Sequence, residues 1–437
     1  MGLLPPGLAK ANMGLLAFGV ENQLVNILVL NAGSSSQKCC LYQLPHDAPW
    51  PEKPIPPLWS GCGDWGHYDD HAELTVQSYP EGADEAGVSL AWNINDPSPT
   101  HVIEALLATL WTGPAAVITS VDEIDCVGHR VVHGGPTYTR PERLTPTVKQ
   151  EITAAIPFAP LHNPANLNGI GVMEELLGPT VPQVAVFDTA FHRQMPPVAK
   201  IYPLPYALFE QGIQRYGFHG ISHAHVSHQA SLILNRDLHD LALITCHLGN
   251  GCSLAAVKQG RCVDTTMGFT PTAGLMMGTR CGDLDPGILV YLARQGYSPE
   301  ELDQLINRQS GLVGVSGISS DLREILAAVA TGNSQAQLAY DLYIYHLQAK
   351  ISSLIPALGR LDALVFTAGV GENSPQVRRD VCHGLAWLGL DLNEALNSQH
   401  PRDQDIAMTH SHIRVLVIHT QEDWAIAQAC WENLTRT

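Results

Sequence analysis

Apolar runs and polar turns alternate along the chain, and two stretches share one plan. Residues 26–30 form a short apolar, β-branched run that predicts a buried strand, and the turn after it contains Gly33 and three serines before Lys38. Residues 243–257 repeat the pattern, with an apolar strand, a turn around Gly249 and a second apolar strand. Gly33 and Gly249 align about half the chain apart, which indicates two related halves.

Strand and helix signals alternate along the rest of the chain, which predicts an α/β fold. Helical periodicity covers residues 101–111, 145–156, 222–234, 321–328, 334–358 and 422–434. Short apolar runs predict strands at residues 124–132, 184–187, 364–367 and 413–418, and residues 44–99 favour hairpins and loops.

Cap signals locate two further helices. Asn163 followed by Pro164 predicts an N-cap with proline at the first helical position, and this helix runs to about Leu177. Ser298 and Glu301 form a capping box around another proline. Residues 368–373 are predicted to be a glycine turn that precedes a helix.

Composition and charge narrow the class of protein. A chain of 437 residues with 45% hydrophobic and 15% charged residues suits a globular protein of two domains. The net charge of −18 argues against nucleic acid or an anionic membrane as the main partner. An anionic substrate must therefore be met by a few local Arg and Lys residues.

Cysteine usage and hydropathy indicate the compartment. The ten cysteines contain no C-x-x-C pair, so reduced thiols and a cytoplasmic location are expected. No apolar run reaches the roughly 18 residues of a membrane span. Residues 1–23 lack a clear A-x-A cleavage site, and we predict a disordered extension rather than a signal peptide.

Three glycine-containing turns each follow a predicted strand. The turn after residue 30 offers serine hydroxyls, backbone N–H groups and Lys38 to a phosphate, although a polar hairpin turn is the simpler alternative. It is not a Walker A loop, because G-x-x-x-x-G-K-[ST] is absent. Residues 249–251 could hold terminal phosphates, and residues 369–373 open a helix whose N–H groups suit an anion or a nucleoside. The three turns together favour nucleotide binding.

Two arginines lie in unusual settings. Arg130 lies between strand residues, and Arg280 lies in a run of small residues. Each could serve as a fork for carboxylate or phosphate oxygens. The alternative is an ordinary salt bridge, for example between Arg280 and Asp283.

Histidines and carboxylates end several segments. His219, within a glycine turn, is the best candidate to donate to a transferring phosphoryl group. His219 and His223 have the spacing of a zinc helix, but the Glu of H-E-x-x-H is missing, so zinc is disfavoured. Asp188 ends a strand and could orient Mg²⁺ or an arginine, act as a base, or cap a turn. Glu422 could complement the helix dipole or bind a metal.

Eight motifs, in order along the chain, resemble the acetate kinase (acetokinase) family. They are residues 31–38, 128–135, 160–164, 186–192, 216–223, 247–253, 277–286 and 367–373. The resemblance implies an α/β fold of two similar ribonuclease H-like (actin-like ATPase) domains flanking a central cleft. We expect one domain from residues 24–190 plus 423–437 and the other from residues 191–422.

The resemblance also implies an activity. Acetate kinases transfer a phosphoryl group from ATP to acetate, reversibly and directly, giving acetyl phosphate and ADP. They use Mg²⁺, with Mn²⁺ as an alternative, and are usually cytoplasmic homodimers without nucleic-acid or membrane partners. Propionate kinase is the nearby alternative, because one methylene is worth only about 1–3 kcal/mol of discrimination. A non-catalytic nucleotide switch of the actin and Hsp70 type is the alternative of another class, but it does not need Arg130, Arg280 and His219.

Site roles carry over by motif. The polar roles are Mg²⁺ positions at Asn31 and Glu422, substrate positions at Lys38 and Arg130, transition-state stabilisers at His219 and Arg280, and the catalytic acid at Asp188. The methyl pocket would comprise Val132, Leu161, Phe218 and Pro271. The ATP contacts would be His247, Leu248, Gly249, Asn250, Gly251, Asp321, Leu322, Arg323, Gly369, Val370, Gly371, Glu372 and Asn373.

Two positions depart from the family pattern. Residues 420–423 read Thr-Gln-Glu-Asp where the family commonly has Asn-Glu-Glu, and Cys281 replaces a common Ser.

Overall fold

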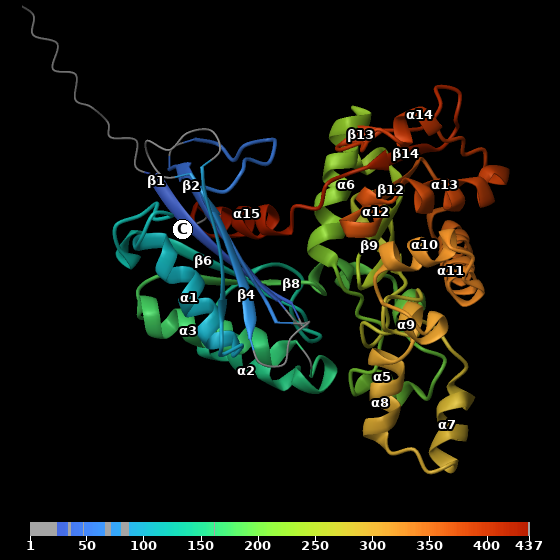
Figure 1. Cartoon of the computed structure of the whole chain (residues 1–437), viewed down its shortest axis with the longest axis horizontal. Helices are drawn as coiled ribbons and strands as arrows, with labels where there is room; N and C mark the ends of the chain where they lie inside the picture. The colour runs from blue at the N-terminus through green and yellow to red at the C-terminus, as the bar shows by residue number, and fades with distance from the viewer. Residues whose placement is uncertain are drawn as a thin grey trace, which may run out of the picture.

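The computed structural model describes residues 24–33, 36–46, 48–65, 71–79, 87–160 and 162–435. The predicted extension at residues 1–23 and the predicted pocket residue Leu161 lie outside the described residues. Two mixed sheets with helices on both faces make up the fold (Figure 1).

The first sheet has the strand order β5-β4-β3-β2-β1-β6-β8-β7. Its strands are β1 (Leu24–Ala32), β2 (Ser36–Pro45), β3 (Trp59–Asp64), β4 (Ala72–Ser78), β5 (Val88–Ile94), β6 (Cys126–Val131), β7 (Glu142–Arg143) and β8 (Gln183–Phe187). Strands β1, β6 and β8 are parallel. The helices α1 (Pro99–Trp111), α2 (Pro146–Ala154) and α3 (Asn163–Leu177) pack on one face, and α15 (Glu422–Thr435) packs on the other.

The second sheet has the strand order β11-β10-β9-β12-β14-β13. Its strands are β9 (Ala242–Leu248), β10 (Cys252–Lys258), β11 (Arg261–Thr265), β12 (Ala363–Thr367), β13 (Gln404–Asp405) and β14 (Arg414–Val417). One face packs against α6 (Gly220–Leu234), and the other packs against α10 (Leu322–Ala330), α11 (Ser334–Leu358) and α13 (Pro375–Gly384).

Shorter elements complete the chain. The remaining α-helices are α4 (Pro197–Lys200), α5 (Tyr206–Glu210), α7 (Pro286–Arg294), α8 (Pro299–Arg308), α9 (Gly311–Ser316), α12 (Ala368–Asn373) and α14 (Glu394–Asn397). The 3₁₀ helices are η1 (Val121–Glu123), η2 (Ile156–Phe158), η3 (Ala190–Gln194), η4 (Leu238–Asp240) and η5 (Ala386–Leu388).

The two sheets share a core topology, which confirms the two related halves predicted from the sequence. The order β3-β2-β1-β6-β8 in the first sheet matches β11-β10-β9-β12-β14 in the second, with an antiparallel meander beside two parallel strands in each. The turns at Gly33 and Gly249 occupy equivalent places. Gly33 N donates to Ser36 O at 2.8 Å, and Gly249 N donates to Gly251 O at 3.0 Å.

Two local predictions were wrong. Asn163 is the first residue of α3 rather than its N-cap, because its amide accepts from His133 N at 3.1 Å and donates to His133 O and Ile152 O. Residues 368–373 form the helix α12 rather than an open turn. The Glu372 side chain reaches back to accept from Ala368 N at 2.8 Å, which closes one helical turn on itself.

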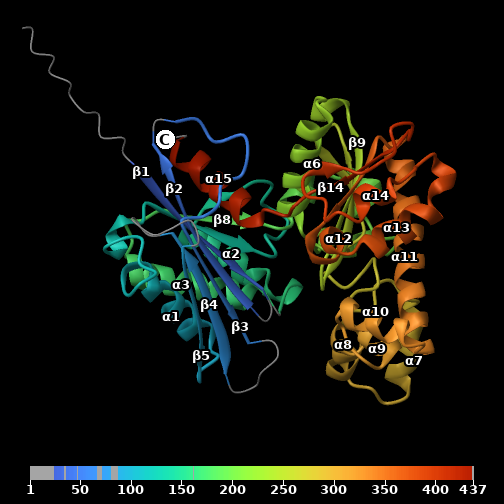
Figure 2. The same ribbon diagram turned by 45° about the horizontal axis from the view of Figure 1, so that its top comes forward.

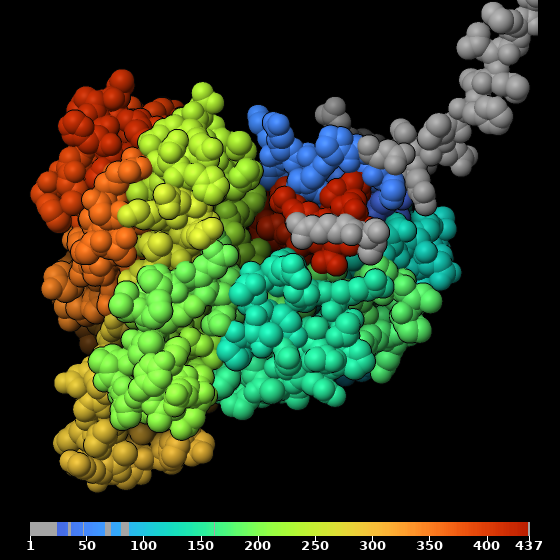
Figure 3. Space-filling model, turned by 180° about the vertical axis from the view of Figure 1, so that it is seen from behind, coloured from blue at the N-terminus to red at the C-terminus, as the bar shows by residue number. Residues whose placement is uncertain are grey.

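The chain crosses between the sheets twice. It leaves the first sheet after β8 through η3, and it returns after β14 to place α15 on β1, β6 and β8 (Figures 1 and 2). Figure 3 shows α15 from behind as an isolated red segment among blue and cyan residues of the N-terminal half. The domain bounds expected near residues 190 and 423 stay a prediction.

Candidate active site

Each of the three parallel strands of the first sheet has a polar residue at its carboxyl end. These residues are Asn31 in β1, Arg130 in β6 and Asp188 directly after β8. Side chains alternate along a strand, and Val25, Ile27 and Val29 of β1 pack against α15. Asn31 lies two residues after Val29 and points to the same face of the strand, so its amide faces the N-terminal end of α15. The core pattern of the strands therefore decides which polar groups meet at this edge.

Arg130 and Asp188 form a buried, forked ion pair. Arg130 Nη2 lies 2.7 Å from Asp188 Oδ2, and Arg130 Nε donates to the same oxygen at 3.1 Å. Burial raises the pKa of the Asp188 carboxyl, and the Arg130 contact opposes that rise. Burial alone would lower the pKa of Arg130, but Asp188 and Glu422 raise it above its ordinary value. The third nitrogen, Nη1, donates to Asn31 Oδ1 at 3.2 Å.

Two adjacent carboxylates at the start of α15 hold the Asn31 amide. Asn31 Nδ2 donates to Asp423 Oδ1 at 2.9 Å and approaches Glu422 Oε2 at 3.5 Å. Burial raises the pKa of the Glu422 carboxyl, but Arg130 and His247 outweigh it and leave that pKa below its ordinary value. Sequence reasoning missed Asp423, and the adjacency of two acids at a helix start was the available signal.

An unpartnered oxygen marks this acidic end. Glu422 Oε1 is buried and has no hydrogen-bond partner among the described residues. Such an atom costs free energy unless a further group, for example a cation, satisfies it. The oxygens of Glu422 and Asn31 are the hard ligands that Mg²⁺ prefers, so the residues present fit that ion.

Lys38 lies beside the same group. It pairs with Asn31 across β1 and β2, and residues directly opposite in an antiparallel pair point to the same face. Its side chain is exposed, and its charge lowers the pKa values of Glu422 and Asp423. Because its side chain is exposed beside these half-buried acids, Lys38 can reach an incoming anion.

His219 and Arg280 converge on the second glycine turn. A Cβ placed on Gly251 would lie 3.4 Å from Arg280 Nη1 and 3.6 Å from His219 Nε2. Only glycine at this position leaves both groups open to a ligand beside the turn.

Arg280 is a cation without a carboxylate partner among the described residues. The predicted alternative, a salt bridge to Asp283, is wrong, because Lys350 pairs with that carboxylate. Arg280 Nη1 instead donates to Pro271 O at 3.2 Å. Burial and the charge of Arg308 lower the pKa of Arg280. An uncompensated, largely enclosed guanidinium is suited to an anionic ligand.

The predicted apolar pocket is partly described. Val132 and Phe218 are buried in one hydrophobic cluster, and Pro271 contacts Arg280 through its carbonyl. His162, which follows the undescribed Leu161, was not predicted as a site residue. Burial and the charges of Arg280 and Arg130 lower the pKa of His162 to about 3, which places its ring within electrostatic reach of both arginines.

A cavity of about 740 Å³ joins many of the predicted nucleotide residues. Its predicted lining residues are Gly249, Asn250, Asp321, Leu322, Arg323, Gly369, Val370 and Asn373. Residues that sequence reasoning missed are Gly278, Leu312, Ser320, Leu326, Tyr343, Ser374, Pro375 and Gln376. Gly278 lies within the motif at residues 277–286, and residues 374–376 follow the motif at residues 367–373. Leu312, Leu326 and Tyr343 come from segments without a motif, so only the fold unites them with the predicted residues.

Five predicted nucleotide residues do not line this cavity. Leu248 is fully buried in the core, and Gly251 faces His219 and Arg280. His247 stacks on His219 with ring centroids 4.2 Å apart. Gly371 O accepts from Arg378 at 2.8 Å, and the Glu372 carboxylate accepts from Thr420 N at 2.9 Å.

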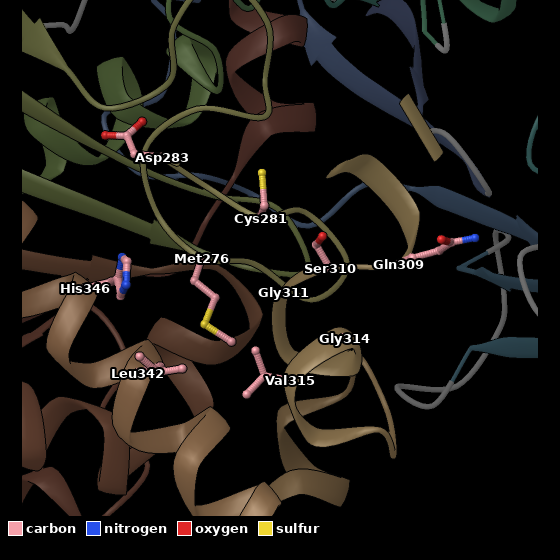
Figure 4. Close-up of a pocket in the computed structure, with 10 residues that line it drawn as sticks. All are labelled: Met276, Cys281, Asp283, Gln309, Ser310, Gly311, Gly314, Val315, Leu342 and His346. Carbon is pink, nitrogen blue, oxygen red and sulfur yellow. The ribbon is translucent and has the colours of Figure 1, made fainter. Parts of the chain in front are cut away.

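A second cavity, of about 400 Å³, adjoins the loop of residues 276–283, which carries Met276, Cys281 and Asp283 (Figure 4). Met276, Cys281 and Asp283 line it from that loop, and Leu342 and His346 line it from α11. Gly311, the first residue of α9, packs directly against the backbone of this loop, because a Cβ there would lie 2.2 Å from Met277 O. The segment around Arg280 is therefore fixed by its contacts with α9.

Two features are absent from the described residues. No group of three or more His, Cys, Asp and Glu side chains in these residues is placed to bind a metal. None of the helices described has the length and apolarity needed to cross a membrane. All ten cysteines are free thiols.

Two sheets of matching topology, with polar residues and a nucleotide-sized cavity at their strand ends, define an actin-like ATPase fold. The model of the acetokinase family matches residues 26–428, and the chain belongs to this family. The family and fold class predicted from the sequence are thereby confirmed.

Relatives cover nearly the whole chain. The acetate kinase of Thermosynechococcus vestitus is 54% identical over 423 residues, which is 94% of this chain and 99% of that protein. The crystal structure of Porphyromonas gingivalis acetate kinase is 39% identical with a TM-score of 0.82, and covers 94% of this chain and 100% of that one. A propionate kinase from Francisella tularensis is 36% identical with a TM-score of 0.82, and covers 93% of this chain and 99% of that one.

Proposed function

We propose that this protein is an acetate kinase, which transfers the terminal phosphoryl group of ATP to acetate and forms acetyl phosphate and ADP reversibly. The convergence of Arg280 and His219 on Gly251 carries the proposal. This turn adjoins the cavity that contains most of the predicted nucleotide residues. Positive and polar groups at the same point suit a phosphoryl group in transfer, whose charge spreads over its oxygens.

Acetate would bind opposite the nucleotide, at the ends of β1 and β6. Arg130 and Lys38 would hold its carboxylate, and Val132, Phe218, Pro271 and the undescribed Leu161 would surround its methyl group. A carboxylate is already ionised near neutral pH, so the attacking oxygen needs no strong base. Alignment and charge neutralisation then supply most of the catalysis.

Asp188 is better assigned to positioning than to acid catalysis. Both of its oxygens lie against Arg130, and its backbone carbonyl accepts from Gly220 N at 2.9 Å. A carboxylate held in this way fixes the guanidinium of Arg130 and the turn of His219 together. We therefore replace the acid role implied by the resemblance with an orienting role.

Glu422 and Asn31 would hold Mg²⁺, or Mn²⁺ in its place, when the nucleotide is bound. The metal would neutralise phosphate charge at the transferring group. Asp423 would keep the Asn31 amide turned so that its oxygen faces Arg130 and the site. Gly249, Asn250 and α12 would hold the phosphates, and Asp321 to Arg323 would hold the nucleoside.

Trapping of acyl phosphate by hydroxylamine tests the function. Purified protein is incubated with ATP, Mg²⁺ and, separately, formate, acetate, propionate and butyrate. Product with acetate, and kcat/KM that falls for longer acids, is the expected result. The highest kcat/KM with propionate would make the protein a propionate kinase with the same mechanism. No product with any acid, while ATP still binds, would favour a nucleotide switch and remove Arg130 as a substrate anchor.

We further propose a homodimer whose interface includes α7. This helix has no buried residue, and it exposes Ile288 (49%), Val290 (52%) and Tyr291 (61%). With α8 it projects from the second half of the molecule (Figures 1 and 2). Ile288 and Tyr291 are neighbours on the surface of this helix, and exposed apolar side chains that adjoin mark an interaction site. A second copy is the partner that the family implies. Light scattering should give a dimer, and Tyr291→Glu should give a monomer.

A further inference from the structure

A chain of hydroxyl and imidazole groups runs behind His219. His219 Nδ1 lies 2.8 Å from Ser253 Oγ, and the same oxygen lies 2.8 Å from His223 Nε2. The other nitrogen of His223, Nδ1, lies 2.7 Å from Thr245 Oγ1. Thr245 Oγ1 in turn donates to Ala255 O at 3.4 Å. Ser253, His223 and Thr245 are fully buried.

The register of the second sheet explains this alignment. Ser253 pairs with His247 and Ala255 pairs with Thr245, so Thr245 and Ser253 point to the same face of β9 and β10. That face packs against α6, whose first turn carries His223 and whose N-cap is His219. Three separate elements therefore place the four groups in sequence.

The hydrogen bond from Thr245 Oγ1 to Ala255 O sets the direction of the other hydrogen bonds in the chain. The Ala255 carbonyl can only accept, so Thr245 donates its single proton there and must accept from His223 Nδ1. Neutral His223 then has no proton on Nε2, and this nitrogen accepts the single proton of Ser253. Ser253 has none left for His219, so His219 Nδ1 must donate to Ser253. In neutral His219 the proton is thus on Nδ1, and Nε2 presents a lone pair toward Gly251.

We propose that Ser253, His223 and Thr245 are positioning residues that hold neutral His219 in the Nδ1–H tautomer, so that His219 donates to a phosphoryl oxygen only after it takes up a proton. The proposal rests on the proposed function for the identity of that acceptor. A lone pair on Nε2 repels an anion, whereas an imidazolium attracts it. One proton from solvent therefore enters with the nucleotide and leaves when the products dissociate.

The surroundings of His219 agree with this charge change. Burial lowers the pKa of His219 well below its ordinary value, and the neighbouring charged groups add to the effect. The groups that face it are His223 on α6, His247 on β9, Arg130 on β6, Asp188 after β8 and Arg280 after β11. An anionic phosphoryl group beside Arg130 and Arg280 would reverse the balance and favour the imidazolium.

Nitrogen NMR of the whole protein tests the tautomer directly. The chain is labelled with ¹⁵N-histidine, and the His219 signals are assigned by their loss in His219→Gln. In the free protein we expect Nδ1 of His219 to be protonated and Nε2 to be unprotonated. A protonated Nε2 in the free protein would overturn the proposal, whatever reaction the protein catalyses.

Thr245→Val is the decisive variant, because it lies two hydrogen bonds away from His219. Valine has nearly the shape of threonine but cannot accept from His223 Nδ1, so His223 moves its proton to Nε2. Ser253 then donates to His219, and the His219 proton moves to Nε2. Ser227→Ala is the matched control, because Ser227 Oγ donates to the His223 backbone carbonyl at 2.7 Å and exchanges no proton with the ring. Equal His219 spectra in both variants would refute the relay.

Kinetics give a second measurement if acyl phosphate is formed. On the alkaline side, kcat/KM of the unmodified protein should fall about tenfold per pH unit, because one proton must be added to the free enzyme. In Thr245→Val, kcat/KM should depend less on pH in this range, because neutral His219 can already donate from Nε2. In Ser227→Ala, the pH dependence should match that of the unmodified protein. An unchanged limb in Thr245→Val would contradict the proposal, since a purely structural role would alter kcat without altering the pH profile.

Discussion

Gly220 and Asp188 are in backbone contact across the junction between the two sheets. Gly220 N donates to Asp188 O at 2.9 Å, and a Cβ on Gly220 would lie 2.2 Å from that oxygen. His219, the preceding residue, has a φ of 57°, in the left-handed region. The contact therefore fixes the histidine to the residue that orients Arg130, and no side chain fits between them.

Gly220→Ala should separate these two groups. The methyl group must displace backbone, and overpacking of this kind costs about 1–3 kcal/mol of the free energy of unfolding. We expect urea unfolding at lower concentration and a reduced kcat, because His219 moves with its helix. Gly171→Ala within α3 is the control, since a Cβ there meets nothing within 4 Å. That change should stabilise the protein by about 0.5–1 kcal/mol. A Gly220→Ala protein with unaltered stability would contradict the contact.

Arg280→Ala should strongly reduce turnover and keep nucleotide binding. The guanidinium has no carboxylate partner among the described residues, so its loss leaves no opposite charge stranded. By analogy with a lost oxyanion donor, the barrier should rise by about 2–4 kcal/mol, or about 30- to 1,000-fold in kcat. ATP affinity, measured by calorimetry, should change little. The exposed Arg402, replaced by Ala, controls for net charge. A kcat like that of the unmodified protein would exclude the proposed role.

Glu422→Gln should raise the Mg²⁺ concentration needed for half-maximal activity. The substitution removes the charge of the carboxylate whose Oε1 lacks a protein partner among the described residues. We expect a rise of at least about tenfold, the smallest loss typical even of groups that only support a metal ligand. Glu300→Gln, an exposed carboxylate at the start of α8, is the control. An unchanged Mg²⁺ dependence would place the metal elsewhere.

Buried neutral histidines should make the protein sensitive to acid. Burial lowers the pKa of His129 to about 4, and its Nε2 lies 2.6 Å from Gln183 Oε1. An unfolded histidine has a pKa near about 6.5. Between these two values the unfolded chain binds more protons, so the stability that His129 contributes is complete above about pH 6.5 and is lost toward pH 4.

His129→Gln tests this contribution. The free energy of unfolding, followed by urea titration from pH 5 to 7, should fall less steeply with acid in the variant. The difference in slope is at most about 1.4 kcal/mol per pH unit. Parallel curves for both proteins would show that His129 does not stay neutral in the fold.

Local patterns predicted much of the fold, because they depend on neighbours in sequence. The hairpin turns at Gly33 and Gly249 and the capping box at Ser298 each follow from a few adjacent residues, and all three are present. Asn163 was misassigned because its amide serves His133, which lies 30 positions away. Single-sequence patterns do not reveal such a partner.

For the site as well, features that depend on neighbouring residues were predicted, and features that depend on distant residues were not. Local sequence settings singled out Arg130, His219 and Arg280, and the resemblance gave them roles. Whether an arginine is paired, however, depends on distant residues. A salt bridge to Asp283 was the alternative considered for Arg280, but Asp283 pairs with Lys350, 67 positions later. The proton relay behind His219 depends on the register of β9 and β10, and no short motif encodes a register.

The two places where the chain crosses between the sheets have a mechanical consequence. One crossing is fixed where Asp188 meets Gly220, and the other is fixed where Glu372 accepts from Thr420 N, two residues before Glu422. If the two sheets rotate as rigid bodies, the rotation axis passes through these crossings, and residues near the axis move least. The rims can then open and close over substrates while Arg130, His219 and Glu422 keep almost constant separations.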